Sequence, residues 1–163
     1  MRVMVKKYLL ALSFVCGCLS LHAQTVNVSD MMSIMNLRED EATNYLTSKG
    51  FKLRLIQQIN GFKVNQFEYD QHGRHETVIW GQNSRAVDGT VLHTIRYSTN
   101  AAPYIINLIA NAQSSGLKLD FQGADHYKNI YFYNSTLYRT SIFLNLDKTY
   151  GLVEIREKDL SGG

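Results

Sequence analysis

The feature that most constrains the fold of this chain is a pattern that occurs twice along it. Gly50-Phe51-Lys52-Leu53 recurs as Gly116-Leu117-Lys118-Leu119, each time after a segment whose apolar residues have helical spacing. Three later segments match in the same order: 65–70 with 129–134, 77–80 with 141–144, and 92–96 with 152–156. A single match is weak evidence, but four in one order indicate an internal duplication.

Each half has the pattern of helix followed by four antiparallel strands. The first half is expected to contain helices over 31–35 and 39–49, then strands over 51–55, 62–69, 77–81 and 90–98. Asn60-Gly61 predicts the first hairpin turn, and Pro103 opens the helix of the second half. We therefore predict an α+β fold, with one long antiparallel sheet and the helices on one face. Residues 24–99 and 100–163 would be the two repeats of a single compact unit.

The N-terminal residues differ from the rest of the chain. A basic start, Met1–Lys7, precedes an apolar run over 8–21 and a small residue at Ala23. This is the pattern of a secretory signal peptide covering residues 1–23, and the apolar run is short for a permanent membrane span. We expect an exported protein, periplasmic or secreted, with no integral membrane span in its mature part.

The two cysteines of the chain, Cys16 and Cys18, both fall inside this leader. Residues 15–18 loosely resemble a lipobox, so an alternative is an exported protein that is lipid-anchored through Cys18. In either case the mature part has no disulfide, and its stability must come from core burial.

Charge excludes two classes of partner. Three of the 17 basic residues lie in the leader, which leaves 14 basic residues against 14 acidic residues in the mature part. A balanced charge gives no electrostatic attraction for nucleic acid or for an anionic membrane. We therefore expect neither as a partner.

The opening helical region carries a resemblance to a known family. Met31–Phe51 has apolar helical positions, a short break at Asn36-Leu37, then Glu41-Ala42 and a closing Gly50-Phe51. Followed by four strands and given twice, this layout resembles the beta-lactamase inhibitor proteins, and the single unit is similar to small outer-membrane assembly lipoproteins. The resemblance implies a sheet used as a binding surface. That family's disulfides are missing here, so inhibition of a lactamase is not implied.

The stretch YDQHGRHETVIW, residues 69–80, comes closest to a chemical motif. His72, His75 and Glu76 could form part of a metal or acid–base site, but a zinc site needs three or four converging ligands. Two residues three apart on a regular strand point to opposite faces. The matching stretch 134–140 contains no such ligands. We interpret the stretch as a hairpin turn, and keep a metal-binding, small-ligand or hydrolase function at these residues as the alternative.

The remaining candidates for chemistry are isolated. His93 reads as a packed strand residue, and Asp125-His126 lies where a loop is expected. The chain has no nucleophile-elbow pattern and no glycine-rich phosphate loop. We therefore predict no cofactor and favour a function without catalysis.

The tyrosines are the clearest indication of where a binding surface would lie. Nine of the ten lie after residue 23, and they gather on expected strands. By period two, Tyr131 and Tyr133 share one face, while Ile130 and Phe132 share the other. Tyrosine marks recognition surfaces, although aromatic residues are also good strand formers and could line the core. We predict a non-catalytic binding module for an envelope or extracellular protein or peptide. The candidate binding residues are Phe67, Tyr69, Trp80, Tyr131, Tyr133 and Tyr138.

Overall fold

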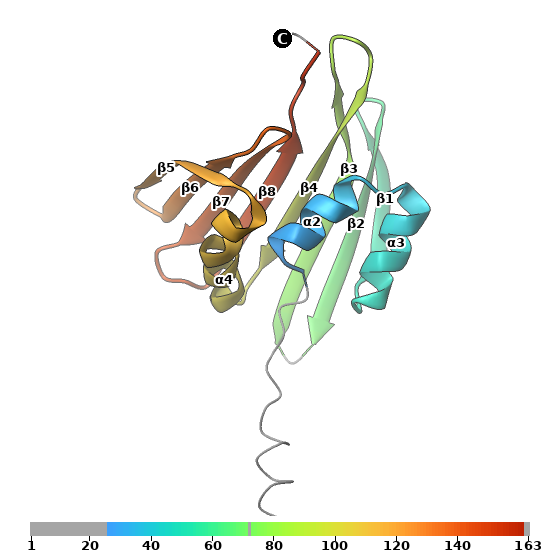
Figure 1. Cartoon of the computed structure of the whole chain (residues 1–163). Coiled ribbons are helices and arrows are strands. Elements are labelled where there is room, and N and C mark those ends of the chain that lie inside the picture. The colour runs from blue at the N-terminus through green and yellow to red at the C-terminus, as the bar shows by residue number, and fades with distance from the viewer. Residues whose placement is uncertain (1–25, 72, 162–163) are drawn as a thin grey trace, which may run out of the picture.

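A computed structural model describes residues 26–71 and 73–161 of the chain. Within them the fold is mixed α/β, with one antiparallel sheet of eight strands and three α-helices (Figure 1). The strands lie in the order β1-β2-β3-β4-β8-β7-β6-β5. The predicted signal peptide, including Cys16 and Cys18, and His72 of the histidine stretch lie outside the described residues.

The elements alternate with short turns throughout the described ranges. The helices are α2 (Val28–Met35), α3 (Glu39–Ser48) and α4 (Ala102–Ala112), the last continued by the 3-10 helix η1 (Gln113–Ser115). The strands are β1 (Lys52–Ile59), β2 (Phe62–Gln71), β3 (Arg74–Arg85), β4 (Val91–Thr99), β5 (Lys118–Ala124), β6 (Lys128–Asn134), β7 (Tyr138–Asn145) and β8 (Gly151–Glu157).

The first helix begins earlier than the sequence pattern predicts. The side chain of Asn27 accepts a hydrogen bond from the Asp30 N–H at 2.8 Å, and the Asp30 carboxylate accepts one from the Asn27 N–H at 3.0 Å. This reciprocal capping box starts α2 at Val28. The predicted start at Met31 was wrong because the N-cap is Asn27, and Asp30 is the third residue of the helix.

Two hairpins of the first half form where the sequence predicts turns. Asn60 and Gly61 both have positive φ, 53° and 81°, which is the backbone of a tight two-residue turn between β1 and β2. The chain turns again around Gly73, where Gln71 pairs with Arg74 and Asp70 with His75. The stretch 69–80 is therefore a hairpin, and β3 begins three residues earlier than its predicted start at Thr77.

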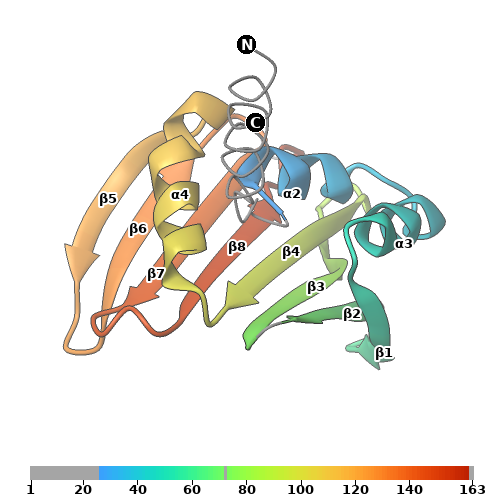
Figure 2. The ribbon, with the colours of Figure 1, turned by 90° about the horizontal axis from the view of Figure 1, so that it is seen from below.

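The two groups of four strands join through β4 and β8, where Tyr97 pairs with Val153 (Figure 2). Within the groups, Leu53 pairs with Phe67 and Leu119 pairs with Tyr133. The sequence alignment matched Phe67 with Tyr131 instead, a difference of two residues. Because side chains alternate with a period of two, a shift of two residues does not change which side chains of a strand share a face.

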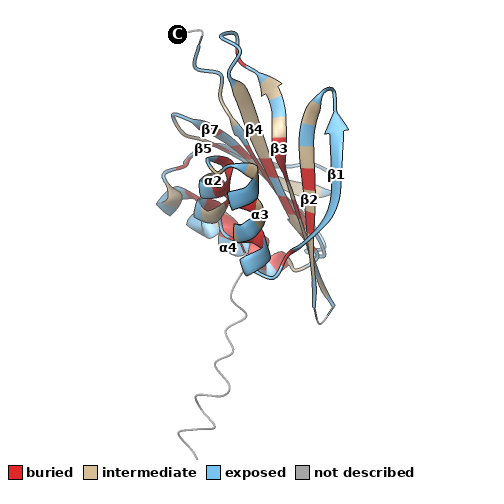
Figure 3. Cartoon of the chain, turned by 90° about the vertical axis from the view of Figure 1, so that its right-hand side faces the viewer, coloured by how far each residue is buried: buried red, intermediate tan, exposed pale blue. Residues whose placement is uncertain are grey.

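The core lies between the helices and the strands they contact. Helix α4 packs on β7, β8 and β4, α2 packs on β4, and α3 packs on β1. Buried residues concentrate on the helices and on the middle of the strands, while β1 is exposed along its whole length (Figure 3). A Cβ atom at Gly151 would lie 2.2 Å from Ile105 Cγ1, so glycine lets α4 pack closely on β8.

Candidate functional site

The aromatic side chains predicted as a binding row belong to the core. Their exposed fractions are 0% for Phe67, 6% for Trp80, 5% for Tyr133 and 6% for Tyr138. Tyr69 and Tyr131 are partly buried and pack against the same core. These six rings therefore do not form an exposed row, and the alternative that the sequence left open, aromatic rings lining the core, is the arrangement observed.

The physical reason is that the cross-strand neighbours of these rings are themselves buried. Tyr133 pairs with Thr140 and Tyr131 pairs with Ile142, and both partners are buried. The Tyr133 hydroxyl donates to the Ile109 carbonyl of α4 at 3.4 Å, so the ring reaches the helix layer. Burial also raises the pKa of the Tyr133 hydroxyl, with a further contribution from Tyr131.

The side chains that alternate with these buried rings form a second surface, which we call the phenylalanine face. Its apolar centre consists of Phe121, Ile130, Phe132, Phe143 and Leu152 on β5 to β8. The ring centroids of Phe121 and Phe132 are 5.7 Å apart, and those of Phe132 and Phe143 are 6.3 Å apart. Phe121 is 50% exposed and Phe132 39%, values high for clustered rings of this size.

Strand register extends this face across all eight strands. Direct cross-strand pairs connect one side chain per strand, in the row Phe121, Phe132, Ser141, Glu154, Arg96, Ile79, Gln66 and Leu55. The row is apolar at its β5 end, charged in the middle and mixed toward β1. A partner lying across the strands would meet these three zones in turn.

Glu154 stands at the centre of the row and is held by two arginines. Its carboxylate accepts hydrogen bonds from Arg96 Nε at 3.0 Å and from Arg156 Nε at 2.6 Å, and the Glu154 side chain is only 11% exposed. Burial alone would raise the pKa of Glu154, but hydrogen bonds from Arg156 and Arg96 outweigh it, so the pKa lies below its ordinary value. The carboxylate is therefore ionised and fixes both guanidinium groups on this face.

The rim of the phenylalanine face is predominantly basic. Lys128 Nζ lies 4.9 Å from the centroid of the Phe143 ring, and Lys118 and Arg139 both pair in register with Asn134. The basic side chains placed on this face by register or contact are Lys52, Arg54, Arg96, Lys118, Lys128, Arg139 and Arg156, against Glu68, Asp70, Asp120 and Glu154 as acidic ones. A hollow of about 350 Å³ lies beside Phe132 and is lined also by Asp120, Arg139 and Ser141.

The histidine stretch has a structural explanation. Glu76 is fully buried, its carboxylate lies 2.8 Å from Arg74 Nε, and the Tyr97 hydroxyl donates to it at 3.0 Å. The His75 N–H donates to the Asn100 side chain at 2.8 Å, which ties the hairpin to the chain just before α4. Within residues 26–71 and 73–161, no three histidine, cysteine, aspartate or glutamate side chains come together as a metal site. The Glu76 carboxylate is thus held inside the fold by Arg74 and Tyr97.

The two other histidine positions have different surroundings. Asp125 Oδ1 accepts hydrogen bonds from the backbone N–H groups of Tyr127 and Lys128, so Asp125-His126 forms the predicted turn. His93 lies on β4, where its ring stacks on Trp80 with centroids 6.0 Å apart and contacts Glu157. His93 is packed as predicted, but no sequence pattern indicates its contact with Glu157, which is 64 residues away.

The sequence pattern separates the two faces of β6, but the face predicted to be exposed, that of Tyr131 and Tyr133, is the one that packs against the core. Ile130 and Phe132 on one face are as apolar as Tyr131 and Tyr133 on the other. Alternation cannot decide which of two apolar faces is covered. The available signal was the basic residues Lys128 and those on neighbouring strands, which share the face of Phe132.

Comparisons of the chain with models of protein families, with curated proteins and with solved structures found no match. The resemblance to the beta-lactamase inhibitor proteins therefore rests on the order of elements alone. No helix among the described residues is long and apolar enough to cross a bilayer.

Proposed function

We propose that this chain is an exported, non-catalytic binding module whose phenylalanine face recognises a protein or peptide of the cell envelope or the extracellular space. Export rests on the signal-peptide pattern of residues 1–23, with lipid anchoring through Cys18 as the second mode of export. The observation that carries the recognition role is the exposure of the clustered rings Phe121 and Phe132 beside a hollow.

The proposal includes a duplicated scaffold, in which residues 24–99 and 100–163 are copies of one unit and the helices cover one face. Support comes from the first strand pair of each half. The register of β1 and β2 shifts between Leu53 and Leu55, and that of β5 and β6 shifts between Leu119 and Phe121. Helices on one face would leave the phenylalanine face uncovered along the whole sheet.

The chemistry of the face selects the kind of partner. Clustered phenylalanine rings favour apolar side chains of the partner, because their burial removes apolar surface from water. The basic rim, including Arg139 and Lys118, favours carboxylates around those apolar groups. The expected partner is therefore an acidic protein surface or an extended acidic peptide with aromatic or aliphatic anchors.

A peptide array tests this recognition directly. Purified protein is applied to peptides that vary independently in apolar and acidic content, and the affinity of the best binders is measured in solution. Peptides with both features are expected to bind best, and Phe132→Ala is expected to weaken their binding about tenfold or more.

Ile106→Ala is the matched control, because Ile106 is 42% exposed but lies on α4 rather than on the phenylalanine face. It should leave peptide affinity unchanged. Equal losses for Phe132→Ala and Ile106→Ala, or a preference for basic peptides, would contradict the proposal.

A further inference from the structure

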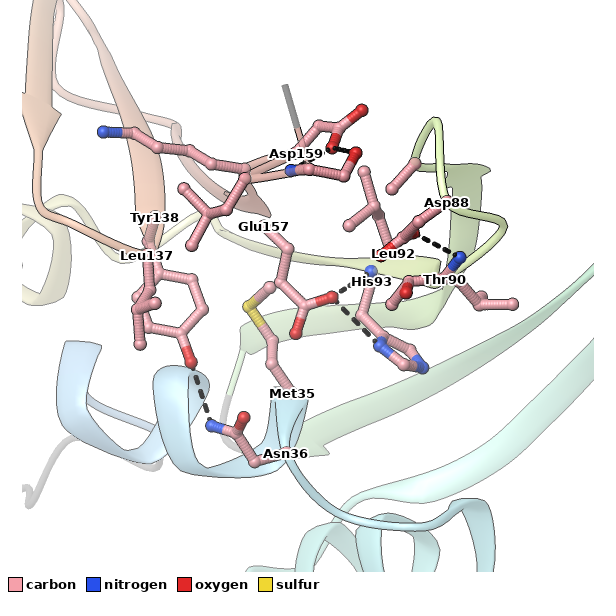
Figure 4. A pocket seen from close by; sticks show the side chains of 15 residues that line it. Met35, Asn36, Asp88, Thr90, Leu92, His93, Leu137, Tyr138, Glu157 and Asp159 are labelled. Carbon is pink, nitrogen blue, oxygen red and sulfur yellow. Dashed lines mark hydrogen bonds and ion pairs between the residues drawn. The ribbon is translucent and has the colours of Figure 1, made fainter. Parts of the chain in front are cut away.

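A second hollow lies on the other side of the sheet, at the end of the core where α2 stops. It is a cavity of about 580 Å³ between the C-terminal end of α2, the start of β4 with the loop before it, the start of β7, and the residues at and after the end of β8 (Figure 4). A volume of this size is typical of small-molecule sites. The cavity shares no residue with the phenylalanine face.

One part of the cavity wall is apolar. Met35 is 1% exposed and Tyr138 6%, so both are rigid parts of the core that also line the cavity. Leu137 and Leu160 line it as well and are 50% and 57% exposed, which is unusual for leucine side chains facing the same hollow. An apolar group placed here would cover both leucines.

The other part of the wall carries Glu157, whose side chain is 20% exposed. One carboxylate oxygen, Oε2, accepts a hydrogen bond from the His93 N–H at 2.6 Å and lies 3.2 Å from His93 Nδ1. The second oxygen, Oε1, has no hydrogen-bond donor among the described residues. Figure 4 places the carboxylate between the His93 ring and the Met35 side chain, where polar and apolar walls meet.

Tyr138 offers a second partly used group. Its hydroxyl accepts a hydrogen bond from Asn36 Nδ2 at 2.9 Å and donates to no acceptor in the described part of the chain (Figure 4). A buried hydroxyl normally finds a partner for its proton. A ligand oxygen in the cavity would supply one.

The charge of the lining is negative. Asp88 and Asp159 line the cavity together with Glu157. The Thr90 backbone N–H donates a hydrogen bond to Asp88, the Ser161 hydroxyl donates one to Asp159, and these bonds lower the pKa of each aspartate. Lys158 is the one lysine of the lining. Its ammonium group donates a hydrogen bond to the Ser135 carbonyl, and Ser135 does not line the cavity. The carboxylates outnumber the cations, yet they do not converge as a metal site within the described residues.

We infer that this cavity binds a small organic cation, an ammonium or guanidinium group on an apolar body, with the cation against Glu157 and the apolar body against Met35 and Leu137. The cation would donate a hydrogen bond to Glu157 Oε1 and neutralise the excess negative charge of the lining. A neutral or anionic molecule would leave that charge uncompensated. An oxygen on the same molecule would accept a hydrogen bond from the Tyr138 hydroxyl. Such chemistry is offered by a free amine and equally by a lysine or arginine side chain of a peptide.

Binding of defined probes to the full chain tests the inference, with chemical-shift changes as the readout. The probes are hexylamine and agmatine, with hexanol and hexanoate as neutral and anionic controls, and lysine blocked at both ends as the peptide source. Saturable binding of the cations at millimolar concentration or tighter is expected, with hexanol and hexanoate at least about tenfold weaker. Tighter binding of blocked lysine than of the free amines assigns the site to peptide side chains, and the reverse order assigns it to free amines.

Glu157→Gln is expected to weaken amine binding about tenfold or more, because glutamine keeps the acceptor for the His93 N–H but loses the charge. Asp88→Asn changes an exposed residue and provides the same test if Glu157→Gln does not fold. Asp147→Asn, a turn aspartate outside the cavity, is the matched control for net charge and should leave binding unchanged. Equal binding of hexanol and hexylamine, no saturable binding of any cation, or unchanged binding in both cavity variants would overturn the inference.

Discussion

The two faces of β6 differ in what covers them, although their residues are alike in size and apolarity. Tyr133 is 5% exposed and its hydroxyl reaches the Ile109 carbonyl of α4, whereas the adjacent Phe132 is 39% exposed and contacts the rings of Phe121 and Phe143. The covered face stabilises the fold, and the uncovered face keeps apolar surface that folding alone does not require. That difference is why we place recognition at Phe132 rather than at Tyr133.

The two faces also differ in how they treat charge. On the covered side, Glu76 is fully buried against Arg74 and Tyr97, at the end of the sheet where Gln71 pairs with Arg74. On the phenylalanine face, Glu154 lies in the middle of the sheet between Arg96 and Arg156, whose side chains are 45% and 54% exposed. The Glu76 carboxylate therefore lies at the edge of the core, whereas the Glu154 carboxylate lies at the centre of the phenylalanine face.

The largest effect expected from this comparison is on stability. Tyr133→Ala should lower the free energy of unfolding by about 3 kcal/mol, because it removes a buried ring and leaves a cavity under α4. Phe132→Ala should lower it by about 1 kcal/mol or less, because it removes only ring contacts on an exposed surface. Urea unfolding followed by circular dichroism measures both values, and similar losses for the two variants would erase the distinction between the faces.

A smaller, pH-dependent effect is expected for Glu154→Gln. The folded-state pKa of Glu154 lies below its ordinary value, so its ion pairs stabilise the fold above that ordinary value of about 4.5, and the contribution is lost as the pH falls through the folded pKa. The variant should be less stable than the wild type by about 1–2 kcal/mol at pH 7, and the difference should shrink in acid.

The control for this variant is Glu39→Gln. Glu39 pairs with Lys63 on the surface, with side chains 41% and 44% exposed, so its loss should change stability by about 0.5 kcal/mol or less. A constant difference between wild type and Glu154→Gln from pH 7 to pH 3 would mean that the two arginines do not stabilise the ionised carboxylate.

Much of the local structure could be predicted because it depends on neighbours in sequence. Asn60-Gly61 formed its turn because both residues adopt positive φ, and the stretch 69–80 formed a hairpin as its bend-forming residues indicate. The start of α2 was misplaced because Asn27, Ser29 and Asp30 are all good cap residues. Only the reciprocal hydrogen bonds of Asn27 and Asp30 select one of them.

The site was harder to predict because it depends on contacts between distant strands. Period two separated Phe132 from Tyr133, but the choice of the covered face needs the position of α4, which is set by tertiary packing such as that of Ile105 on Gly151. The contact of His93 with Glu157 depends in the same way on the pairing of β4 with β8. Neither the packing of α4 nor the pairing of β4 with β8 can be recognised from residues that are close in the sequence.

Thiol labelling of the folded protein tests the assignment of the two faces most directly. With Cys16 and Cys18 replaced by serine, Phe132→Cys and Tyr133→Cys each introduce the single cysteine of the chain. The thiol at position 132 should react with a maleimide at the rate of an exposed thiol. The thiol at position 133 should react at least about a hundredfold more slowly, since it requires opening of the structure. Equal rates in natively folded protein, or faster reaction at position 133, would contradict the account.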